Sequence, residues 1–160
     1  MQESNQLLEI DPNYILLDLE AGDAHDAIEL MCAPLHDHGA VRATYADETI
    51  ERERKHPTGL PTRPFPIAFP HAEAEGVHRS ALSVATLRKP VDFRNMAEPE
   101  EDLPVEIIFL LANREPEEQV QALRRLALIF GESEKLVALR EMQDPVQTAK
   151  WLTSEILAVD

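Results

Sequence analysis

The sequence is poor in several features that would assign it to a common class of protein. Its 160 residues include one cysteine, Cys32, so no disulfide can form within the chain, and this agrees with a cytosolic location. Acidic residues outnumber basic ones by 30 to 15, and the net charge of −15 argues against nucleic acid or an anionic membrane as a partner. No apolar run approaches the ~20 residues of a membrane-spanning helix, and the first residues show no secretory signal. We therefore expect a cytoplasmic protein.

Motifs that identify several enzyme classes are also missing. The chain has no His-Glu-x-x-His, no paired cysteines and no glycine-rich phosphate loop. It also lacks the Gly-x-Ser-x-Gly turn of many hydrolases. His36 and His38 would point to different faces of a helix and could share a metal only in an extended segment, so we expect no metal site there. Cys32 lies in an apolar stretch and is expected to pack in the core.

The first part of the chain predicts two helices after a short strand. The apolar run 14–19 predicts the strand. The helix that follows should begin at the N-cap Asp23 and end at Gly39, with Pro34 as a site of kinking or shortening. Residues 43–56 are charged, contain few helix breakers and predict the second helix.

The middle of the chain predicts short strands separated by a loop. Residues 57–66 hold four prolines and one glycine, so we expect a loop. The segment "IAFPH" (67–71) then predicts a short strand that ends in a histidine. Residues 81–87 predict a further strand. The segment "KPVDF" (89–93) should follow it as an edge strand or a turn, because proline cannot donate a backbone hydrogen bond.

The last third predicts one buried strand and a set of helices. Residues 97–104 should form an acidic loop, and the nearly apolar segment 105–112 suits a central strand covered on both faces. Three helical segments follow within 116–157, and the last should start at the N-cap Asp144 with Pro145 behind it. The apolar stripe of the first of these helices is expected to comprise Val120, Leu123, Ala127 and Phe130.

Length and the order of the elements predict one domain of the α/β class. A chain of 160 residues corresponds to a single domain, here 1–160, and can bury roughly 70% of its unfolded surface. Strands alternate with helices early in the chain, and helices close it. This order predicts a mixed β-sheet with helices packed on both faces.

The setting of His71 distinguishes it from the other five histidines, which we interpret as surface or turn residues. Pro70 has a fixed φ and favours extended geometry at Phe69, so His71 emerges from a stiff backbone at the end of a strand. Strand ends of this kind are common ligand positions in α/β folds. A neutral imidazole can act as a nucleophile through one ring nitrogen while a hydrogen bond fixes the other. A turn histidine without a function remains the alternative.

Several segments around this histidine occur in an order that resembles a known family. An Arg-Glu pair starts at Arg52, six residues before the Thr-Gly pair at Thr58, and a Pro-His pair ends at His71. "KPVDF", the strand "EIIFLLA" and the helix "EQVQALRRLALIF" follow. This order is similar to that of enzyme IIA of the bacterial phosphoenolpyruvate-dependent sugar phosphotransferase system, in its fructose–mannitol–nitrogen superfamily, over about residues 14–157. The form "PTGLPT…PHAEAEGVHRSA" is most similar to the galactitol-type branch.

The resemblance implies a phosphotransferase that needs no metal and no organic cofactor. His71 would accept a phosphoryl group from the phosphohistidine of the carrier HPr and pass it to a cysteine of an enzyme IIB, which acts with a membrane enzyme IIC. Arg52 matches the arginine that helps to neutralise the phosphate. Many members carry a second active-site histidine at the start of the helix after the apolar strand. Gln119 stands at that position here, and an amide can supply only a neutral hydrogen bond.

The resemblance also predicts a partly apolar surface around the reactive histidine. Leu60, Phe65 and Phe69 are candidates for it, although each is also a candidate core residue. Glu73 and Glu75 are interpreted as solvated turn residues that would repel a phosphate. A regulatory protein of the same fold, whose phosphorylation state is recognised by partners, is the alternative function, and a plain small-ligand domain is a third. The sequence does not identify the sugar.

Overall fold

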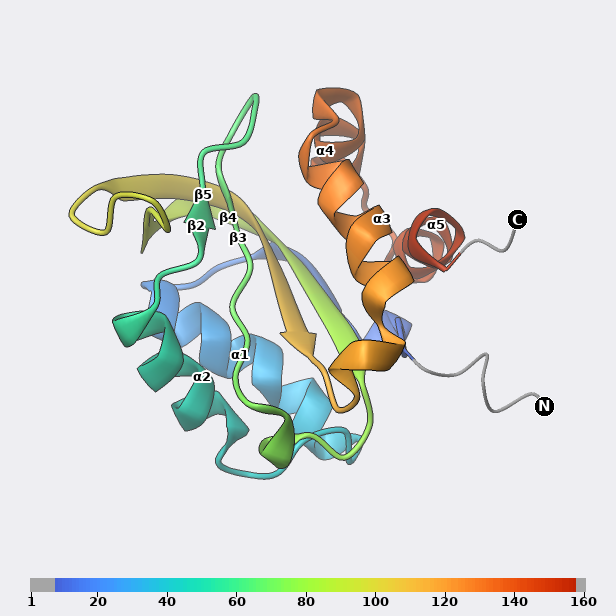
Figure 1. The fold of residues 1–160 in the computed structure, drawn as a ribbon. Coiled ribbons are helices and arrows are strands. Elements are labelled where there is room, and N and C mark those ends of the chain that lie inside the picture. The colour runs from blue at the N-terminus through green and yellow to red at the C-terminus, as the bar shows by residue number, and fades with distance from the viewer. Residues whose placement is uncertain (1–7, 158–160) are drawn as a thin grey trace.

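The computed structural model describes residues 8–157 as one β-sheet with helices packed against it (Figure 1). The prediction that the chain starts without a secretory signal falls largely on residues 1–7, which lie outside the described part, as do residues 158–160. Within the described part, no helix combines the length and the apolar character needed to cross a membrane.

Five strands form a mixed sheet in the order β1-β4-β5-β3-β2. Its strands are β1 (Ile15–Leu19), β2 (Gly59–Leu60), β3 (Ile67–Ala68), β4 (Ala81–Arg94) and β5 (Asp102–Ala112). β1 runs parallel to β4 and β3 runs parallel to β5, whereas the β4–β5 and β2–β3 pairs are antiparallel. β5 is therefore the central strand, as its apolar sequence predicts.

Helices cover both faces of the sheet, which confirms the predicted α/β class (Figure 1). The helices on one face are α1 (Ala24–Asp37) and α2 (Tyr45–Lys55). Those on the other face are α3 (Val120–Phe130), α4 (Ser133–Arg140) and α5 (Pro145–Ile156). One cluster of buried side chains joins α1 and α2 to the sheet, and a second joins the other three helices to it. Short 3-10 turns occur at Pro12–Tyr14, Ala74–Gly76 and Pro116–Glu118.

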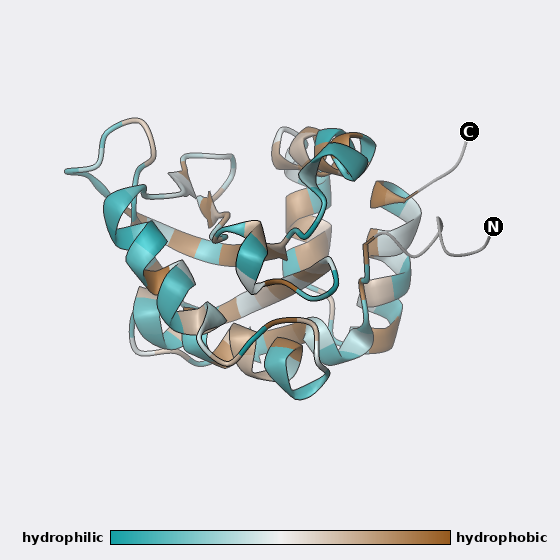
Figure 2. Cartoon of the chain, turned by 60° about the horizontal axis from the view of Figure 1, so that its bottom comes forward, coloured by the Kyte–Doolittle hydropathy of each residue, from teal (hydrophilic) through white to brown (hydrophobic). Residues whose placement is uncertain are grey.

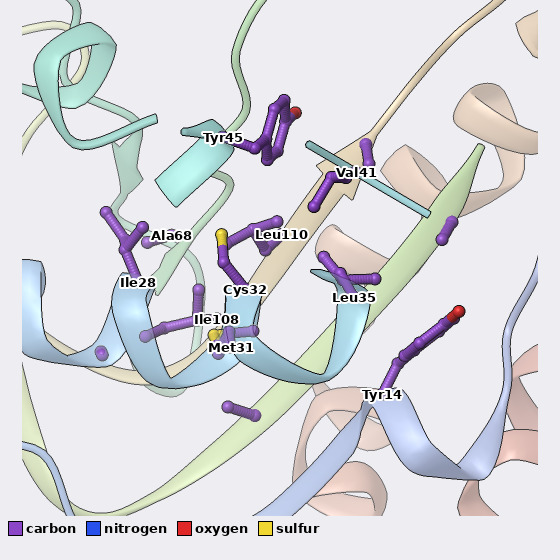
Figure 3. Close-up of a cluster of buried hydrophobic side chains, with 14 of the residues drawn as sticks. Tyr14, Ile28, Met31, Cys32, Leu35, Val41, Tyr45, Ala68, Ile108 and Leu110 are labelled. Carbon is purple, nitrogen blue, oxygen red and sulfur yellow. The ribbon is translucent and has the colours of Figure 1, made fainter. Parts of the chain in front are cut away.

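The core on the α1 side shows how helical spacing places apolar residues (Figure 3). One face of α1 packs toward the sheet through Ile28, Met31, Cys32 and Leu35. Cys32 is only 3% exposed, which confirms its predicted place in the core. Burial raises the pKa of the Cys32 thiol to about 12, so the thiol stays protonated at physiological pH.

The predicted ends of α1 and α5 are confirmed by their capping contacts. At the start of α1, the Asp23 carboxylate accepts a hydrogen bond of 2.8 Å from the Asp26 N–H. α1 continues through Pro34 and ends before Gly39, whose φ of +78° lies in the region that favours glycine. At the start of α5, the Asp144 carboxylate accepts a bond of 2.9 Å from the backbone of the second helical residue.

Three predicted boundaries in the sheet region are wrong. The strand predicted at 81–87 does not end there but continues through "KPVDF" as β4, which pairs with β5 on both sides of Pro90. Because β1 pairs with β4 only as far as Leu87, "KPVDF" lies at the edge of the sheet, as predicted. A register shift between Thr86 and Val91 accommodates the proline, which has no N–H to donate. The end of the expected acidic loop 97–104 belongs to β5, which starts at Asp102. The expected loop 57–66 contains the two residues of β2.

The predicted apolar stripe of α3 is also wrong. Val120 is 51% exposed and Ala127 is exposed, whereas Leu123 and Phe130 are partly buried. The fully buried positions of this helix are Ala122, Leu126 and Ile129. The apolar residues of α3 form one broad face, and the predicted stripe and the buried positions lie along different edges of it. Packing against the sheet and against α5 selects the edge that is buried.

Candidate active site

His71 lies at the carboxyl end of β3, beside the central strand. The Leu111 N–H donates to the Pro70 carbonyl oxygen at 3.1 Å, and His71 itself pairs with Leu111 as an isolated parallel bridge. The contact with β5 therefore continues past the two residues of β3 to the histidine. Because the Pro70–His71 backbone is bonded to β5 in this way, the Cα atom that carries the half-buried His71 side chain is held in place.

The orientation of the His71 ring is set by a hydrogen bond to its own strand. Nδ1 lies 3.0 Å from the carbonyl oxygen of Phe69. A carbonyl oxygen can only accept, so Nδ1 carries the proton and Nε2 of the neutral ring keeps its lone pair. The Phe69 ring packs against the imidazole at a centroid distance of 5.7 Å. The geometry therefore presents Nε2 as the nucleophilic atom.

A buried carboxylate supports the strand that carries this histidine. Glu53, only 7% exposed, accepts hydrogen bonds of 2.8 Å each from the N–H and the hydroxyl group of Thr58. The Phe69 N–H in turn donates to the Thr58 carbonyl oxygen and side-chain oxygen, at 3.3 and 3.1 Å. Burial raises the pKa of Glu53 even though these donors oppose the rise.

Close packing explains the glycine that follows this threonine. A Cβ atom at Gly59 would lie 2.6 Å from the carbonyl oxygen of Arg94 at the end of β4. No side chain fits at that distance, so the backbone of β2 can approach β4 only as glycine. The Arg-Glu and Thr-Gly pairs recognised in the sequence thus have a structural role at their glutamate, threonine and glycine.

Tyr45 holds the segment that follows His71. Its hydroxyl group donates to the Leu111 carbonyl oxygen and accepts from the Ala72 N–H, both at 3.1 Å. Tyr45 is fully buried on α2 beside the sheet (Figure 3), and burial raises the pKa of its hydroxyl group. One side chain therefore joins α2, β5 and the chain just past the histidine. α2 itself is hydrophilic over most of its length (Figure 2).

Arg52 reaches the same pocket as His71 from α2. Its Nη1 donates to the carboxylate of Glu73 at 2.8 Å. Its Nε is buried and has no hydrogen-bond acceptor among the described residues. A buried N–H donor without an acceptor is costly, so this guanidinium is suited to an additional anionic ligand.

The pocket that contains these groups has a volume of about 350 Å³. Its apolar walls are Phe69, Leu111, Pro116 and Leu123. Its polar side chains are Arg52, His71, Glu73 and Asn113. The side-chain oxygen of Asn113 is buried and has no hydrogen-bond partner among the described residues. The pocket thus combines an imidazole, a guanidinium and an unpaired amide oxygen within apolar walls.

The other predicted site residues lie outside the lining of this pocket. Gln119 is 2% exposed and joins the turn Pro116–Glu118 to α3, but it is not a lining residue. Phe65 is a core residue with the Arg140 guanidinium 4.6 Å from its ring centre. Leu60 packs partly buried against the same core cluster. Among residues 8–157, no group of three or more potential metal ligands occurs.

Sequence reasoning missed several members of the site. The polar residue Asn113 directly follows the buried strand β5, and such a position could have drawn attention to it. Glu73 is exposed, as predicted, but it also forms an ion pair with Arg52 across 21 residues of sequence. No local pattern predicts a contact between residues that far apart.

Comparison with known proteins agrees with this architecture. The family model "Phosphoenolpyruvate-dependent sugar phosphotransferase system, EIIA 2" matches residues 9–154. The galactitol-specific EIIA component of Escherichia coli (strain K12) is 32% identical over 111 residues, which cover 66% of this chain and 71% of that protein. The transcriptional regulator ManR of Bacillus subtilis is 31% identical over 101 residues, which cover 63% of this chain but only 14% of the regulator.

A solved structure shows the same fold at lower identity. A chain from the complex of enzyme IIAMTL and phosphorylated enzyme IIBMTL of Escherichia coli superimposes with a TM-score of 0.72 at 21% identity. The match covers 92% of this chain and 99% of that chain. With the family model spanning nearly the whole described part, the resemblance seen in the sequence is confirmed: the chain belongs to the EIIA type 2 family of the phosphoenolpyruvate-dependent sugar phosphotransferase system.

Proposed function

We propose that this chain is a cytoplasmic phosphocarrier in which Nε2 of His71 accepts a phosphoryl group from the phosphohistidine of HPr. It then passes the group to a cysteine of an enzyme IIB that works with a membrane enzyme IIC. The observation that carries the proposal is the hydrogen bond between Nδ1 of His71 and the Phe69 carbonyl oxygen. This bond fixes the tautomer whose free lone pair is on Nε2. Family membership supports the type of reaction.

The transfer step is a displacement at phosphorus. The lone pair of His71 Nε2 forms the new N–P bond while the N–P bond of the donor breaks, and the bonding pair returns to the donor imidazole. Nδ1 keeps its proton throughout, because the Phe69 carbonyl oxygen stabilises the positive charge that develops on the ring. Positioning and charge stabilisation supply most of the catalysis in such a transfer. In the second step the thiolate of the enzyme IIB cysteine attacks phosphorus, and His71 recovers its lone pair.

Arg52 is the group that meets the negative charge of the phosphoryl oxygens. Its buried Nε lacks an acceptor, and a phosphate oxygen is an acceptor that binds guanidinium strongly. The predicted role of Gln119 as a replacement for a second histidine remains a prediction. The polar side chain that lines the β5 side of the pocket is instead Asn113.

Phosphorylation in a reconstituted system tests the proposal. The protein is incubated with enzyme I, HPr and phosphoenolpyruvate, and intact mass is expected to rise by about 80 Da, the mass of one phosphoryl group. The label should be acid-labile, as a phosphohistidine is. His71→Gln should abolish labelling, and His78→Gln, a change at an exposed histidine nearby, should leave it unchanged. An unlabelled wild type, or equal labelling of His71→Gln, would refute the proposal.

The similarity to ManR keeps a regulatory function as the second candidate. The two functions differ in the fate of the phosphoryl group. A transport component should pass the label to the cysteine of a purified galactitol-type enzyme IIB within seconds. A regulatory domain should retain the label in the presence of that enzyme IIB and should bind its partner in only one phosphorylation state.

A further inference from the structure

In the unphosphorylated protein, the guanidinium of Arg52 is already paired with the carboxylate of Glu73. Arg52 Nη1 and Glu73 Oε2 are 2.8 Å apart, and both residues line the pocket of His71. Glu73 follows the histidine by two residues, so its carboxylate is held near the place where phosphorus would bind. Glu48 and Glu51 on α2 are paired with other cations, and the neighbouring Glu53 accepts its hydrogen bonds from Thr58.

This ion pair is exposed enough to break easily. The Glu73 side chain is 75% exposed and that of Arg52 is 36% exposed, and pairs of this kind are weak because water competes for both ions. A phosphoryl group on His71 would carry a charge of about −1.5 to −2 and three acceptor oxygens. It can also use the buried Nε, which the carboxylate leaves without an acceptor. The phosphoryl group therefore wins the competition for the guanidinium.

We propose that Glu73 is a displaceable counter-ion that controls how tightly His71 holds the phosphoryl group, an inference that rests on the proposed function. In the unphosphorylated protein Glu73 neutralises Arg52 and keeps it beside the pocket. On phosphorylation Arg52 turns from Glu73 to the phosphoryl oxygens, and Glu73 is left as an unpaired negative charge close to them. The loss of the ion pair and the repulsion between Glu73 and the phosphoryl oxygens both disfavour the phosphorylated state. Glu73 thus lowers the affinity of the site for the phosphoryl group and favours its onward transfer.

The equilibrium constant for phosphoryl transfer between HPr and this protein measures the effect of Glu73 directly. Purified phospho-HPr is mixed with the unphosphorylated protein in the absence of enzyme I, and the two phosphohistidines are quantified at equilibrium by intact mass or by phosphorus NMR. Glu73→Gln should shift the equilibrium toward the phosphorylated protein by about 2- to 5-fold, the range expected for an exposed pair. Glu75→Gln removes the same charge two residues further on, from an exposed side chain with no ion pair in the described part of the chain, and should shift it less than about 1.5-fold.

The direction in which Glu73→Gln shifts the equilibrium distinguishes the proposed role of Glu73 from a merely structural one. A variant that merely disturbed the site would accept less phosphate, whereas Glu73→Gln is expected to accept more. Equal constants for Glu73→Gln and Glu75→Gln, or a shift away from the phosphorylated protein, would overturn the inference and leave the proposed function intact. An unlabelled wild type would refute the proposed function and this inference together.

The exchange of partners by Arg52 has its own spectroscopic signal. In the unphosphorylated protein, Glu73→Gln should move the Nε–Hε resonance of Arg52, and Glu75→Gln should not. Phosphorylation of the wild type should move that resonance again and bring the carboxyl carbon of Glu73 to the shift of an unpaired glutamate such as Glu75. A Glu73 signal that does not change on phosphorylation would show that the pair persists and would refute the displacement.

Discussion

Replacing Tyr45 by phenylalanine removes a single hydroxyl group that makes two hydrogen bonds across the candidate site. The hydroxyl group donates to the Leu111 carbonyl oxygen and accepts from the Ala72 N–H. Phenylalanine fills the same space, so the change tests these two contacts rather than the packing of the ring. The N–H just past His71 and the carbonyl oxygen of β5 both lose a partner.

The size of the effect follows from the burial of the two groups left behind. Leu111 is only 5% exposed, so its carbonyl oxygen loses a hydrogen bond with little access to water. Ala72 is partly exposed, and water can partly replace the lost bond to its N–H. A buried group left without a partner costs about 1 to 3 kcal/mol, which gives a loss of about 2 to 4 kcal/mol in the free energy of unfolding for Tyr45→Phe. This is a large part of the stability of a typical domain.

Urea unfolding followed by circular dichroism measures this loss. The midpoint should fall while the slope m stays constant, because the change affects stability and not the surface exposed on unfolding. Tyr14→Phe is the matched control, because the hydroxyl group of this likewise buried tyrosine donates at 3.2 Å to the carboxylate of Glu9, which is partly exposed to water. It should cost less than about 1 kcal/mol. A loss below about 0.5 kcal/mol for Tyr45→Phe, or equal losses for both variants, would refute the assignment of Tyr45 as the link between α2, β5 and the His71 segment.

Three further changes test other parts of the site and the core. Arg52→Ala should keep the fold but lower the rate of phosphoryl acceptance by about 10²-fold, the range for a lost charge-stabilising group; stopped-flow labelling measures the rate, and near wild-type transfer would remove Arg52 from the site. Gly59→Ala should destabilise the fold by about 1 to 3 kcal/mol in urea unfolding, because its Cβ would press on the Arg94 carbonyl oxygen, and an unchanged midpoint would contradict the close approach. Cys32, with a pKa near 12 in the folded state and about 8.5 when unfolded, should resist iodoacetamide at pH 8 until urea is added; rapid labelling of the native protein would show that the thiol is accessible.

The elements with strong local signals were predictable from the sequence. Asp23 and Asp144 are N-cap residues that bond to the first turn of their helices, and the contacts involve only near neighbours in the chain. β5 was recognisable because a strand buried on both faces needs apolar residues on both. These signals predict the order of the main elements and hence the α/β class, although β2 lies in an expected loop.

The errors arose where tertiary contacts overrule a local preference. The strand predicted at 81–87 ends before Pro90, but β4 continues through the proline. β1 pairs with β4 only as far as Leu87, so the missing N–H of the proline falls beyond that pairing and within a register shift. In α3, the apolar residues form one broad face, so their spacing alone cannot decide which edge of that face is buried most deeply. Both outcomes depend on neighbours that the local sequence does not contain.

In the candidate site, too, features set by neighbouring residues were predictable, whereas contacts between distant residues were not. His71 could be singled out because Pro70 and the strand before it are adjacent in the sequence. The contact of Tyr45 with Leu111 joins residues 66 apart, and no periodicity predicts it. The resemblance to enzyme IIA supplied Arg52, but it did not show that the neighbouring Glu53 turns inward to hold Thr58.

Glu73 shows how a correct physical premise can lead to an incomplete interpretation. A carboxylate close to a phosphohistidine does repel it, and on that ground the sequence suggested a residue without a role. The structure pairs Glu73 with Arg52, the cation that we propose binds the phosphoryl group. A carrier must release its phosphoryl group as readily as it accepts it, so a site that binds phosphate as strongly as possible would retain it. The repulsion that argues against a role for Glu73 is therefore the property by which, in our proposal, it sets the balance between acceptance and transfer.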